Sequence, residues 1–323
     1  MSFRSENLLI TGGAGFIGSN FINYLFSKNK KIKVFNLDSL TYAGNIKNTN
    51  NFKQNPNYKF INGDITDSNL LIDIFQKYKI DGIINFAAES HVDNSIINPE
   101  IFIRTNVNGV FNLLKVAYSS WMDKPFSCKK GYYKSRFHQI STDEVYGSID
   151  GKSVNEKNKY APNSPYSASK ASADMLVRSF NKTFGLNTTI SICSNNYGPN
   201  QHEEKFIPKI INSINKNIPI TVFGNGKNIR DWIYVDDHCK AIELIFNQSR
   251  EGETYNIGAS NELSNLELIK IISKILEKKY EIEFIEDRYG HDKRYSLNSD
   301  KIKNEFNWDV EDNFENNIKK FLK

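Results

Sequence analysis

The fold is decided by the stretch Asn7-Leu8-Leu9-Ile10-Thr11-Gly12-Gly13-Ala14-Gly15-Phe16-Ile17-Gly18. Its first five residues predict a short apolar strand, and the apolar spacing from Phe21 to Leu25 predicts a helix after the glycines. Glycine is needed between the two because the backbone must turn tightly and let a pyrophosphate approach the positive end of the helix. The glycines fit both G-x-G-x-x-G and G-x-x-G-x-x-G, through Gly13, Gly15 and Gly18 or through Gly12, Gly15 and Gly18. Strand, turn and helix together predict a dinucleotide-binding unit.

Acidic and small residues follow the next predicted strands. The strand at 32–37 ends in Asp38, twenty residues after Gly18. An acid there can accept hydrogen bonds from both adenosine ribose hydroxyls and would repel a 2′-phosphate, so NAD is favoured over NADP. The strand at 58–61 leads into Gly63-Asp64-Ile65, which places an acid where adenine could be contacted. The strand at 82–86 leads into Ala87-Ala88-Glu89-Ser90, whose small residues let a dinucleotide lie against the sheet edge.

The alternation of strands and helices predicts an α/β protein with a Rossmann-type, doubly wound parallel sheet. We expect an NAD-binding domain over residues 1–197, with a return segment near 235–260. From residue 198 the apolar runs shorten, which predicts a smaller mixed α/β substrate-binding lobe over 198–323. Residues 121–136 are polar, aromatic and basic, and predict a surface loop. The helices and the remaining strands are expected at 70–78, 99–118, 167–180, 137–140 and 188–193.

The composition excludes several classes of protein. The chain has 323 residues, a net charge of +5 and no block of basic residues, so it is not expected to bind nucleic acid. No apolar run reaches the roughly 18 residues needed to span a membrane, and the first residues have no secretory h-region, so we expect a cytoplasmic protein. Three scattered cysteines and five histidines lack metal-ligand spacing, and no metal is expected.

The stretch from Ser141 to Lys170 carries the acid, base and hydroxyl groups. Tyr166 and Lys170 are four residues apart and share one face of the helix expected there. A tyrosine with a pKa near 10 is a poor base, but a nearby ammonium lowers that pKa, so Tyr166 is predicted as a base and Lys170 as its activator. The adjacent carboxylates Asp143 and Glu144 would push their pKa values apart, leaving one protonated and one ionised, although this argument does not say which is which.

With these motifs in hand, the chain resembles the extended short-chain dehydrogenase/reductase family nearly from end to end. Within it, the chain is similar to the nucleoside-diphosphate-glucose 4,6-dehydratases, best known with dTDP-glucose. Besides the glycine turn and the Tyr–Lys pair, the resemblance is carried by Asp38-Ser39-Leu40-Thr41-Tyr42-Ala43-Gly44-Asn45, Ala87-Ala88-Glu89-Ser90-His91-Val92-Asp93, Ser141-Thr142-Asp143-Glu144-Val145-Tyr146-Gly147, Asn195-Asn196-Tyr197-Gly198-Pro199, Ile229-Arg230-Asp231-Trp232 and Gly290-His291-Asp292-Lys293-Arg294-Tyr295. The Thr142-Asp143-Glu144 triplet separates dehydratases from the related epimerases and decarboxylases. Tyr289, in place of a proline, and Phe306-Asn307-Trp308, in place of Leu-Gly-Trp, depart from the family pattern.

The resemblance implies a catalytic role for each of five residues. Tyr166 takes the C4 hydroxyl proton while hydride passes to NAD, and Lys170 supports it and holds the nicotinamide ribose. Glu144 removes the C5 proton, Asp143 gives a proton to the departing C6 hydroxyl, and Thr142 holds the sugar beside Tyr166. Hydride then returns to C6, so NAD stays tightly bound and is regenerated in each turnover.

The resemblance also implies two sets of binding residues. The residues expected to bind NAD are Gly12, Gly15, Phe16, Ile17, Gly18, Asp38, Ser39, Thr41, Asp64, Ile65, Phe86, Ala87, Ala88, Ser90, Thr105, Tyr166, Lys170 and Asn196. The residues expected to bind the nucleotide sugar are Ser90, Thr142, Asn195, Lys205, Phe206, Thr221, Val222, Phe223, Arg230, Asn265, Arg288, His291 and Asp292. Among them, the Arg230 guanidinium can bind a diphosphate in a bidentate way.

Three alternatives stay open from the sequence. A sugar-nucleotide 4-epimerase would share the fold, NAD and the Tyr–Lys pair but has no use for Asp143 and Glu144. A catalytically idle NAD-binding protein with a regulatory role is the second. Thymine and uracil differ by one methyl group, so dTDP-glucose and UDP-glucose are both kept as substrates. The resemblance further implies a homodimer through two helices, one of which carries Tyr166, and a product for deoxysugar biosynthesis such as that of rhamnose.

Overall fold

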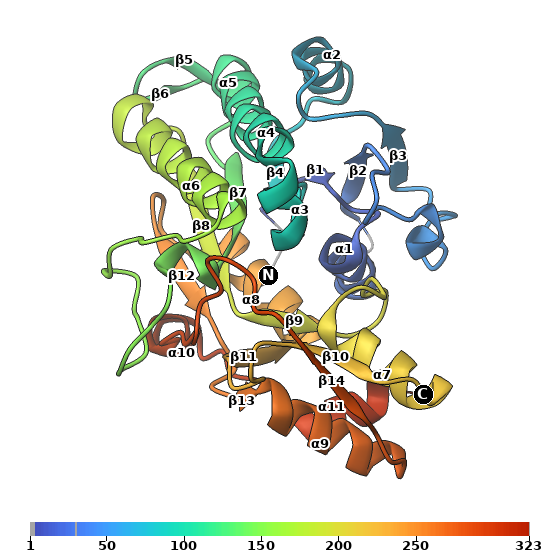
Figure 1. The fold of residues 1–323 in the computed structure, drawn as a ribbon. Helices are drawn as coiled ribbons and strands as arrows, with labels where there is room; N and C mark the ends of the chain where they lie inside the picture. Colours follow the sequence, from blue (N-terminus) through green and yellow to red (C-terminus); the bar gives the residue numbers. More distant parts are fainter. Residues whose placement is uncertain (1–3, 30, 323) are drawn as a thin grey trace.

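The computed structural model describes residues 4–29 and 31–322, and Figure 1 shows two lobes. The larger lobe is built on a seven-stranded sheet with the strand order β12-β8-β7-β4-β1-β2-β3, in which every neighbouring pair is parallel. Its strands are β1 (Asn7–Thr11), β2 (Lys33–Asp38), β3 (Tyr58–Asn62), β4 (Gly82–Asn85), β7 (Arg136–Thr142), β8 (Thr188–Cys193) and β12 (Thr254–Ile257). The order reverses beside β1, and such switch points of parallel sheets are where ligands bind. The predicted α/β fold with a doubly wound parallel sheet is confirmed.

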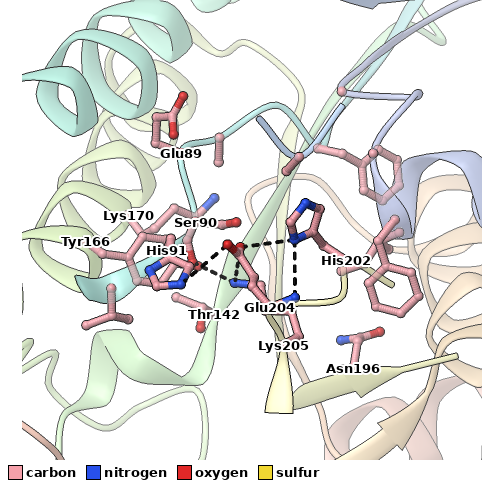
Figure 2. Close-up of a pocket in the computed structure, with 18 of the residues that line it drawn as sticks. Glu89, Ser90, His91, Thr142, Tyr166, Lys170, Asn196, His202, Glu204 and Lys205 are labelled. Atoms are coloured by element: carbon pink, nitrogen blue, oxygen red, sulfur yellow. Dashed lines mark hydrogen bonds and ion pairs between the residues drawn. The ribbon is translucent and has the colours of Figure 1, made fainter. Parts of the chain in front are cut away.

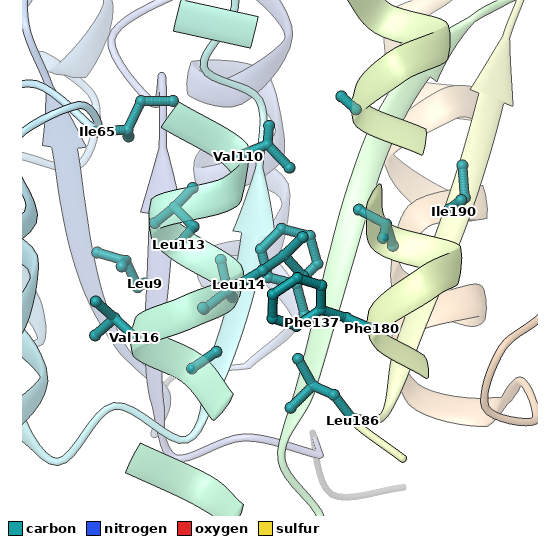
Figure 3. Packing of buried hydrophobic residues seen from close by; sticks show 14 of the residues in the cluster. Leu9, Ile65, Val110, Leu113, Leu114, Val116, Phe137, Phe180, Leu186 and Ile190 are labelled. Carbon is teal, nitrogen blue, oxygen red and sulfur yellow. The ribbon is translucent and has the colours of Figure 1, made fainter. Parts of the chain in front are cut away.

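Helices cover both faces of this sheet. The first face packs against α2 (Ser68–Tyr78), α5 (Val110–Trp121) and α6 (Pro165–Phe184), and the second against α1 (Phe16–Lys28) and α8 (Val235–Gln248). Figure 3 shows Leu113, Leu114 and Phe180 from the helices meeting Leu9 and Phe137 from the strands. The strands are buried on both sides, which explains their nearly continuous apolar runs.

The smaller lobe is mixed α/β. It contains the parallel pair β10 (Ile220–Phe223) and β14 (Ile282–Ile285), and the three-stranded sheet β13 (Glu262–Ser264), β11 (Ile229–Tyr234) and β9 (Asn195–Tyr197). The helices α7 (Phe206–Lys216), α9 (Asn265–Leu276) and α11 (Phe314–Phe321) pack on these strands around an isoleucine-rich core. The segment near 235–260 returns to the larger lobe as α8 and β12, and α10 (Asp300–Phe306) contacts β12.

Two predictions about local structure need correction. The helix expected over 99–118 is three consecutive pieces, α4 (Pro99–Phe102), the π-helical turn η2 (Ile103–Gly109) and α5. The surface loop expected over 121–136 is wrong at both ends, since Trp121 and Arg136 are each 1% exposed.

Backbone carbonyls explain why these two polar side chains are buried. The Trp121 indole N–H donates to the carbonyl of Ile80 at 2.8 Å, and Arg136 donates to the carbonyls of Ile245, Phe246 and Ser249 at 2.7 to 2.9 Å. Between them, β5 (Met122–Lys124) and β6 (Ser127–Cys128) form a short antiparallel pair. Hydrogen bonds to carbonyls distant in sequence compensate the burial of a basic side chain, and local composition does not reveal them.

Candidate active site

A cavity of about 1000 Å³ lies between the two lobes at the carboxyl ends of the parallel strands. All of the residues predicted as catalytic or NAD-binding line it, and so do all but two of those predicted to bind the nucleotide sugar. The exceptions are Val222 and Asp292. Val222 is 1% exposed in the core of the smaller lobe, because alternate residues of β10 face opposite sides. The Asp292 carboxylate is also buried, accepting hydrogen bonds from Asn163 at 2.7 Å and Tyr295 at 2.8 Å.

The glycine turn forms one end of the cavity. Gly12 has a φ of +71°, and a Cβ there would lie 2.7 Å from the backbone nitrogen of Ala87. A Cβ on Gly18 would lie 2.4 Å from the carbonyl oxygen of Gly12, so both positions require glycine. Helix α1 begins just after Gly15 with no side-chain cap and no acid in its first turn. Its first N–H groups and the positive end of its dipole therefore remain for an anionic group, as a pyrophosphate requires.

Asp38 lies beside this turn at the end of β2. Its carboxylate is 7% exposed and accepts one backbone N–H on each oxygen, from Ala14 and from Leu40, both at 2.8 Å. Burial raises its pKa, and the two N–H groups oppose that rise. Each oxygen keeps a lone pair for a ribose hydroxyl. The glycine cradle, the uncapped helix and this acid fit NAD.

The three residues after Ser141 stand where β7 ends and the 3₁₀ turn η3 (Asp143–Tyr146) begins. The Thr142 hydroxyl accepts the N–H of Glu144 at 3.4 Å and donates to Asp143 Oδ1 at 3.2 Å. Asp143 is 3% exposed, and its Oδ2 has no hydrogen-bond partner among the described residues. That oxygen is one of the buried polar atoms of the cavity lining that could meet a sugar hydroxyl.

The two carboxyl groups have different surroundings. Burial raises the pKa of Asp143 well above its ordinary value, and the charge of Glu144 raises it further. Burial also raises the pKa of Glu144, but the cations Arg230, Arg288 and Lys205 oppose that rise. Burial thus favours the protonated form of both carboxyls, and the three cations oppose this at Glu144, whereas only Arg230 among them does so at Asp143.

Tyr166 and Lys170 lie in the first turns of α6, which begins with a capping box formed by Ser164 and Ser167. The Lys170 ammonium is buried and donates to the carbonyl of Ile140 at 2.6 Å. Burial, followed by the charge of Glu144, raises the pKa of Tyr166, and a hydrogen bond with the Thr142 hydroxyl opposes the rise. In the polypeptide by itself this pKa is therefore raised and not lowered as expected, because burial is the largest cause and the nearby Glu144 and Asp143 carboxylates add to it.

Charged groups from both lobes meet on the substrate side of the cavity, as Figure 2 shows. Glu204 lies 3.6 Å from His91, 3.7 Å from His202 and 3.9 Å from Lys205. Lys205 also donates to the carbonyl of Ser90 at 3.3 Å. Glu204, His91 and His202 were not predicted as site residues. His91 stands inside a quoted motif and Glu204 next to Lys205, so adjacency to predicted residues was the only available signal.

The two arginines of this side are held by further contacts. Arg288 pairs with Asp93 at 3.1 Å, which joins the smaller lobe to the start of α3 (Val92–Ile97). Arg230 is 6% exposed, lies 4.1 Å from the Tyr295 ring centroid and donates to the carbonyls of Ile229 at 2.8 Å and Asp292 at 2.9 Å. Its guanidinium has further N–H donors for a bound anion. Asp292 therefore acts on the site through Arg230.

Within residues 4–29 and 31–322, no group of three or more His, Cys, Asp or Glu side chains could hold a metal ion. Across the same residues, no helix has the length and apolar character needed to cross a membrane.

The fold and site define a nucleotide-sugar dehydratase or epimerase of the extended short-chain dehydrogenase/reductase class. The family model described as GDP-mannose 4,6 dehydratase matches residues 9–321, and the chain belongs to this family. The chain is 44% identical to the dTDP-glucose 4,6-dehydratase of Neisseria gonorrhoeae, with 98% of this chain and 94% of that protein covered. It is 42% identical to the dTDP-glucose 4,6-dehydratase of Salmonella typhimurium, with 97% and 91% covered.

Solved structures give the same assignment. The dTDP-glucose 4,6-dehydratase DesIV from Streptomyces venezuelae, with NAD and TYD bound, has a TM-score of 0.91 at 40% identity, covering 98% of this chain and 95% of that one. The UDP-glucose 4-epimerase of Thermotoga maritima has a TM-score of 0.87 but only 26% identity, with 98% and 97% covered. Backbone shape is thus shared by both enzyme classes, and the side chains of the site must distinguish them.

Proposed function

We propose that this chain is an NAD-dependent dTDP-glucose 4,6-dehydratase, which converts dTDP-glucose to the 4-keto-6-deoxy sugar nucleotide and water. The observation that carries the proposal is the pair of adjacent carboxyl groups, buried Asp143 and half-buried Glu144, which line a cavity that fits NAD together with Tyr166. Burial raises the pKa of both, and Arg230, Arg288 and Lys205 oppose the rise at Glu144. The dehydratase relatives at 42% and 44% identity favour dTDP-glucose over UDP-glucose.

Each residue of the site has a task in the reaction. NAD, when bound, would supply the hydride acceptor for C4 and the hydride donor for C6, and its positive charge would oppose the rise in the pKa of Tyr166. Tyr166 takes the O4 proton, with the Lys170 ammonium one helical turn away. The ketone at C4 then acidifies C5, Glu144 removes the C5 proton, and Asp143 protonates the departing C6 hydroxyl. Arg230, Lys205 and Arg288 form a cationic group suited to the diphosphate.

A 4-epimerase would have the same Tyr–Lys pair but no use for the two carboxylates. An epimerase oxidises and reduces the same carbon, so it needs neither an acid for C6 nor a base for C5. Placing two titratable carboxyls in a dry site would then destabilise the protein with no catalytic benefit. Buried, paired carboxylates therefore support the dehydratase over the epimerase and over the idle NAD-binding protein.

We also propose a homodimer, formed through α5 and α6 with the neighbouring helical segments. Large apolar side chains are exposed on these helices and on α3, α4 and η2, including Ile97, 83% exposed, Ile101, 38%, Ile103, 48%, Phe111, 42%, and Met175, 47%. Exposed apolar groups gathered on neighbouring helices are typical of an interface. Light scattering on the wild type and on Phe111→Glu tests this, since the charge should shift the mass toward a monomer.

Further proposals concern domain organisation and location. We place the boundary between the NAD-binding and nucleotide-sugar lobes near residue 197, with 235–260 returning to the first. We propose a cytoplasmic location, because the cysteines Cys128, Cys193 and Cys239 are all free, as is usual in a reducing compartment.

The function is tested by incubating the purified chain with dTDP-glucose and, separately, with UDP-glucose, with no added reductant. We expect a 4-keto-6-deoxy product, formed faster from dTDP-glucose. Recovery of only the galactose epimer would identify an epimerase. Conversion of neither substrate by NAD-loaded protein would favour the idle binder.

A further inference from the structure

Two residues of the proposed reaction do not regain their starting protonation by themselves. Tyr166 gains the O4 proton, and Asp143 loses a proton to the departing C6 hydroxyl. Glu144 is balanced, because the proton it takes from C5 is replaced at C5 when hydride reaches C6. The overall reaction forms one sugar and one water without net uptake or release of protons. Each turnover therefore leaves one excess proton on Tyr166 and removes one from Asp143.

A single hydroxyl connects these two groups. Thr142 Oγ1 donates to Asp143 Oδ1 at 3.2 Å, and the same hydroxyl lies near enough to the Tyr166 phenol to lower its pKa. Figure 2 shows Thr142 and Tyr166 together at the same end of the cavity. A hydroxyl can donate to one neighbour while it accepts from another, so the three side chains form a continuous path for a proton.

Exchange with bulk water is restricted at both ends of this path. Asp143 is 3% exposed and Tyr166 is 8% exposed in the polypeptide alone. Both face the cavity that substrate and NAD would fill, so a bound substrate covers them further. Without an internal path, Tyr166 could release its proton to solvent only when the cavity opens. Asp143 could take up a proton from solvent only at the same point.

We propose that Thr142 returns the proton from Tyr166 to Asp143 within the closed site, a role that rests on the proposed dehydratase function. The O–H bond of Thr142 breaks as its proton bonds to Asp143 Oδ1, and the phenol proton of Tyr166 bonds to the Thr142 oxygen. Tyr166 is left as the phenolate, Asp143 as the carboxylic acid, and Thr142 unchanged. A positively charged nicotinamide near the phenol would favour the phenolate, and so would favour transfer in this direction once hydride has reached C6.

The test compares Thr142→Val, which keeps the shape and removes the hydroxyl, with Thr142→Ser, which keeps the hydroxyl. The rate of the first turnover is measured by rapid mixing with enzyme in excess, and the steady-state rate with substrate in excess. Loss of a contact with the sugar slows both rates together. Loss of the relay slows only the later turnovers, so the ratio of first-turnover to steady-state rate should rise about 100-fold in Thr142→Val. In Thr142→Ser, the ratio of first-turnover to steady-state rate should stay within about threefold of the wild-type ratio.

A second measurement uses imidazole as a small proton carrier. Raising its concentration at constant pH and ionic strength should speed the steady state of Thr142→Val and leave the wild type unchanged. An unchanged ratio in Thr142→Val, or no response to imidazole, would overturn the relay. Failure of wild type to form product in the first turnover would instead reject the proposed function.

A third measurement does not need an active variant. A pH-indicator dye in weak buffer follows proton exchange with solvent while wild-type protein completes one turnover. The relay predicts no transient proton signal. A transient of about one proton per site would show that Tyr166 and Asp143 are reset through solvent, and it would overturn the proposal even if Thr142→Val failed to fold.

Discussion

The two sides of the cavity are built by different means. Apart from the buried carboxylate of Asp38, the cofactor side consists of backbone and small residues. Gly12 and Gly18 are packed so closely that a Cβ would meet main-chain atoms at 2.7 Å and 2.4 Å. The catalytic and substrate side consists of long charged side chains from distant segments, such as Glu204 with three basic neighbours within 4 Å and Arg288 paired with Asp93. One side recognises its ligand by shape and backbone N–H groups, the other by charge.

The difference has an energetic consequence. Glycines and uncapped N–H groups facing a cavity add no buried charge to the folded chain. On the other side, Asp143 and Lys170 are buried and Glu144 is half-buried. Asp174 does not line the cavity, but it is buried and accepts a hydrogen bond from Ser141, which does. Each of the four groups is less stable there in its charged form. Substitutions on the cofactor side should therefore disturb geometry, whereas those on the catalytic side should change chemistry and pH dependence.

The largest effect is expected for Glu144→Gln. The amide cannot remove the C5 proton, so product formation should fall by about 10³-fold, within the usual range for loss of a general base. Oxidation at C4 does not need Glu144, and the absorbance of NADH at the active site should rise and persist. Spectroscopy of the reaction mixture checks both points. Normal product formation by this variant would show that elimination does not depend on Glu144.

Stability at different pH values tests the buried charges. Burial raises the pKa of Asp174 to about 6. The charge of Lys170 opposes the rise most, followed by Ser141 and Tyr160, which donate to its Oδ2. Because the folded pKa lies above the unfolded value of about 3.9, this group favours the fold below pH 4, and the benefit is lost as pH rises to 6. Two pKa units correspond to about 3 kcal/mol.

Asp174→Asn cannot titrate, so its stability relative to wild type should improve by about 3 kcal/mol between pH 4 and pH 7. Urea denaturation at both pH values measures the change. Asp150→Asn, at an exposed loop position, is the matched control. If the difference in unfolding free energy between wild type and Asp174→Asn were the same at both pH values, burial would not be raising the pKa of Asp174.

Gly12→Ala tests the cofactor side. The added Cβ would contact Ala87 from a left-handed backbone, and such strain costs about 1–3 kcal/mol. NAD affinity, measured by calorimetry, should fall about tenfold or more, since about 1.4 kcal/mol is tenfold in binding. Gly151→Ala is the control, because Gly151 has a φ of +90° but no atom within 4 Å of an added Cβ. Equal NAD affinity in both variants would show that NAD binding does not depend on the close packing of Gly12 against Ala87.

The smallest effect is expected at the start of the helix that carries both Tyr166 and Lys170. Ser164 accepts the N–H of Ser167 at 3.1 Å, and Ser164→Ala should reduce the free energy of unfolding by about 1 kcal/mol with little effect on NAD affinity. Ser172→Ala is the control, because its exposed hydroxyl bonds only the Ala168 carbonyl, at 2.8 Å, within the same helix. Unfolding in urea compares the two, and equal losses would show that the cap is not what anchors this helix.

The difference between the two sides of the cavity also explains which features could be predicted from the sequence. The cofactor side follows from local signals, since the glycine spacing and an acid after the second strand are short-range features. Asp143, Glu144, Tyr166 and Lys170 were predicted because two short motifs hold them.

Other features depend on contacts between distant segments. The burial of Arg136 rests on carbonyls more than 100 residues away, and the sequence predicted a surface loop instead. The group around Glu204 forms only when the lobes meet, and Val222 was assigned to the site without knowing which face of β10 points inward. The raised pKa of Tyr166 depends on the packing around it, which spacing does not reveal.

The central claim is that one redox cycle is opened at C4 and closed at C6 around an elimination. It is tested most directly with dTDP-glucose carrying deuterium at C4, converted to completion in ordinary water and examined by mass spectrometry and NMR. We predict a 4-keto-6-deoxy product that retains one deuterium, located at C6, with hydrogen from solvent at C5. Deuterium recovered at C4, or lost to solvent, would contradict the account.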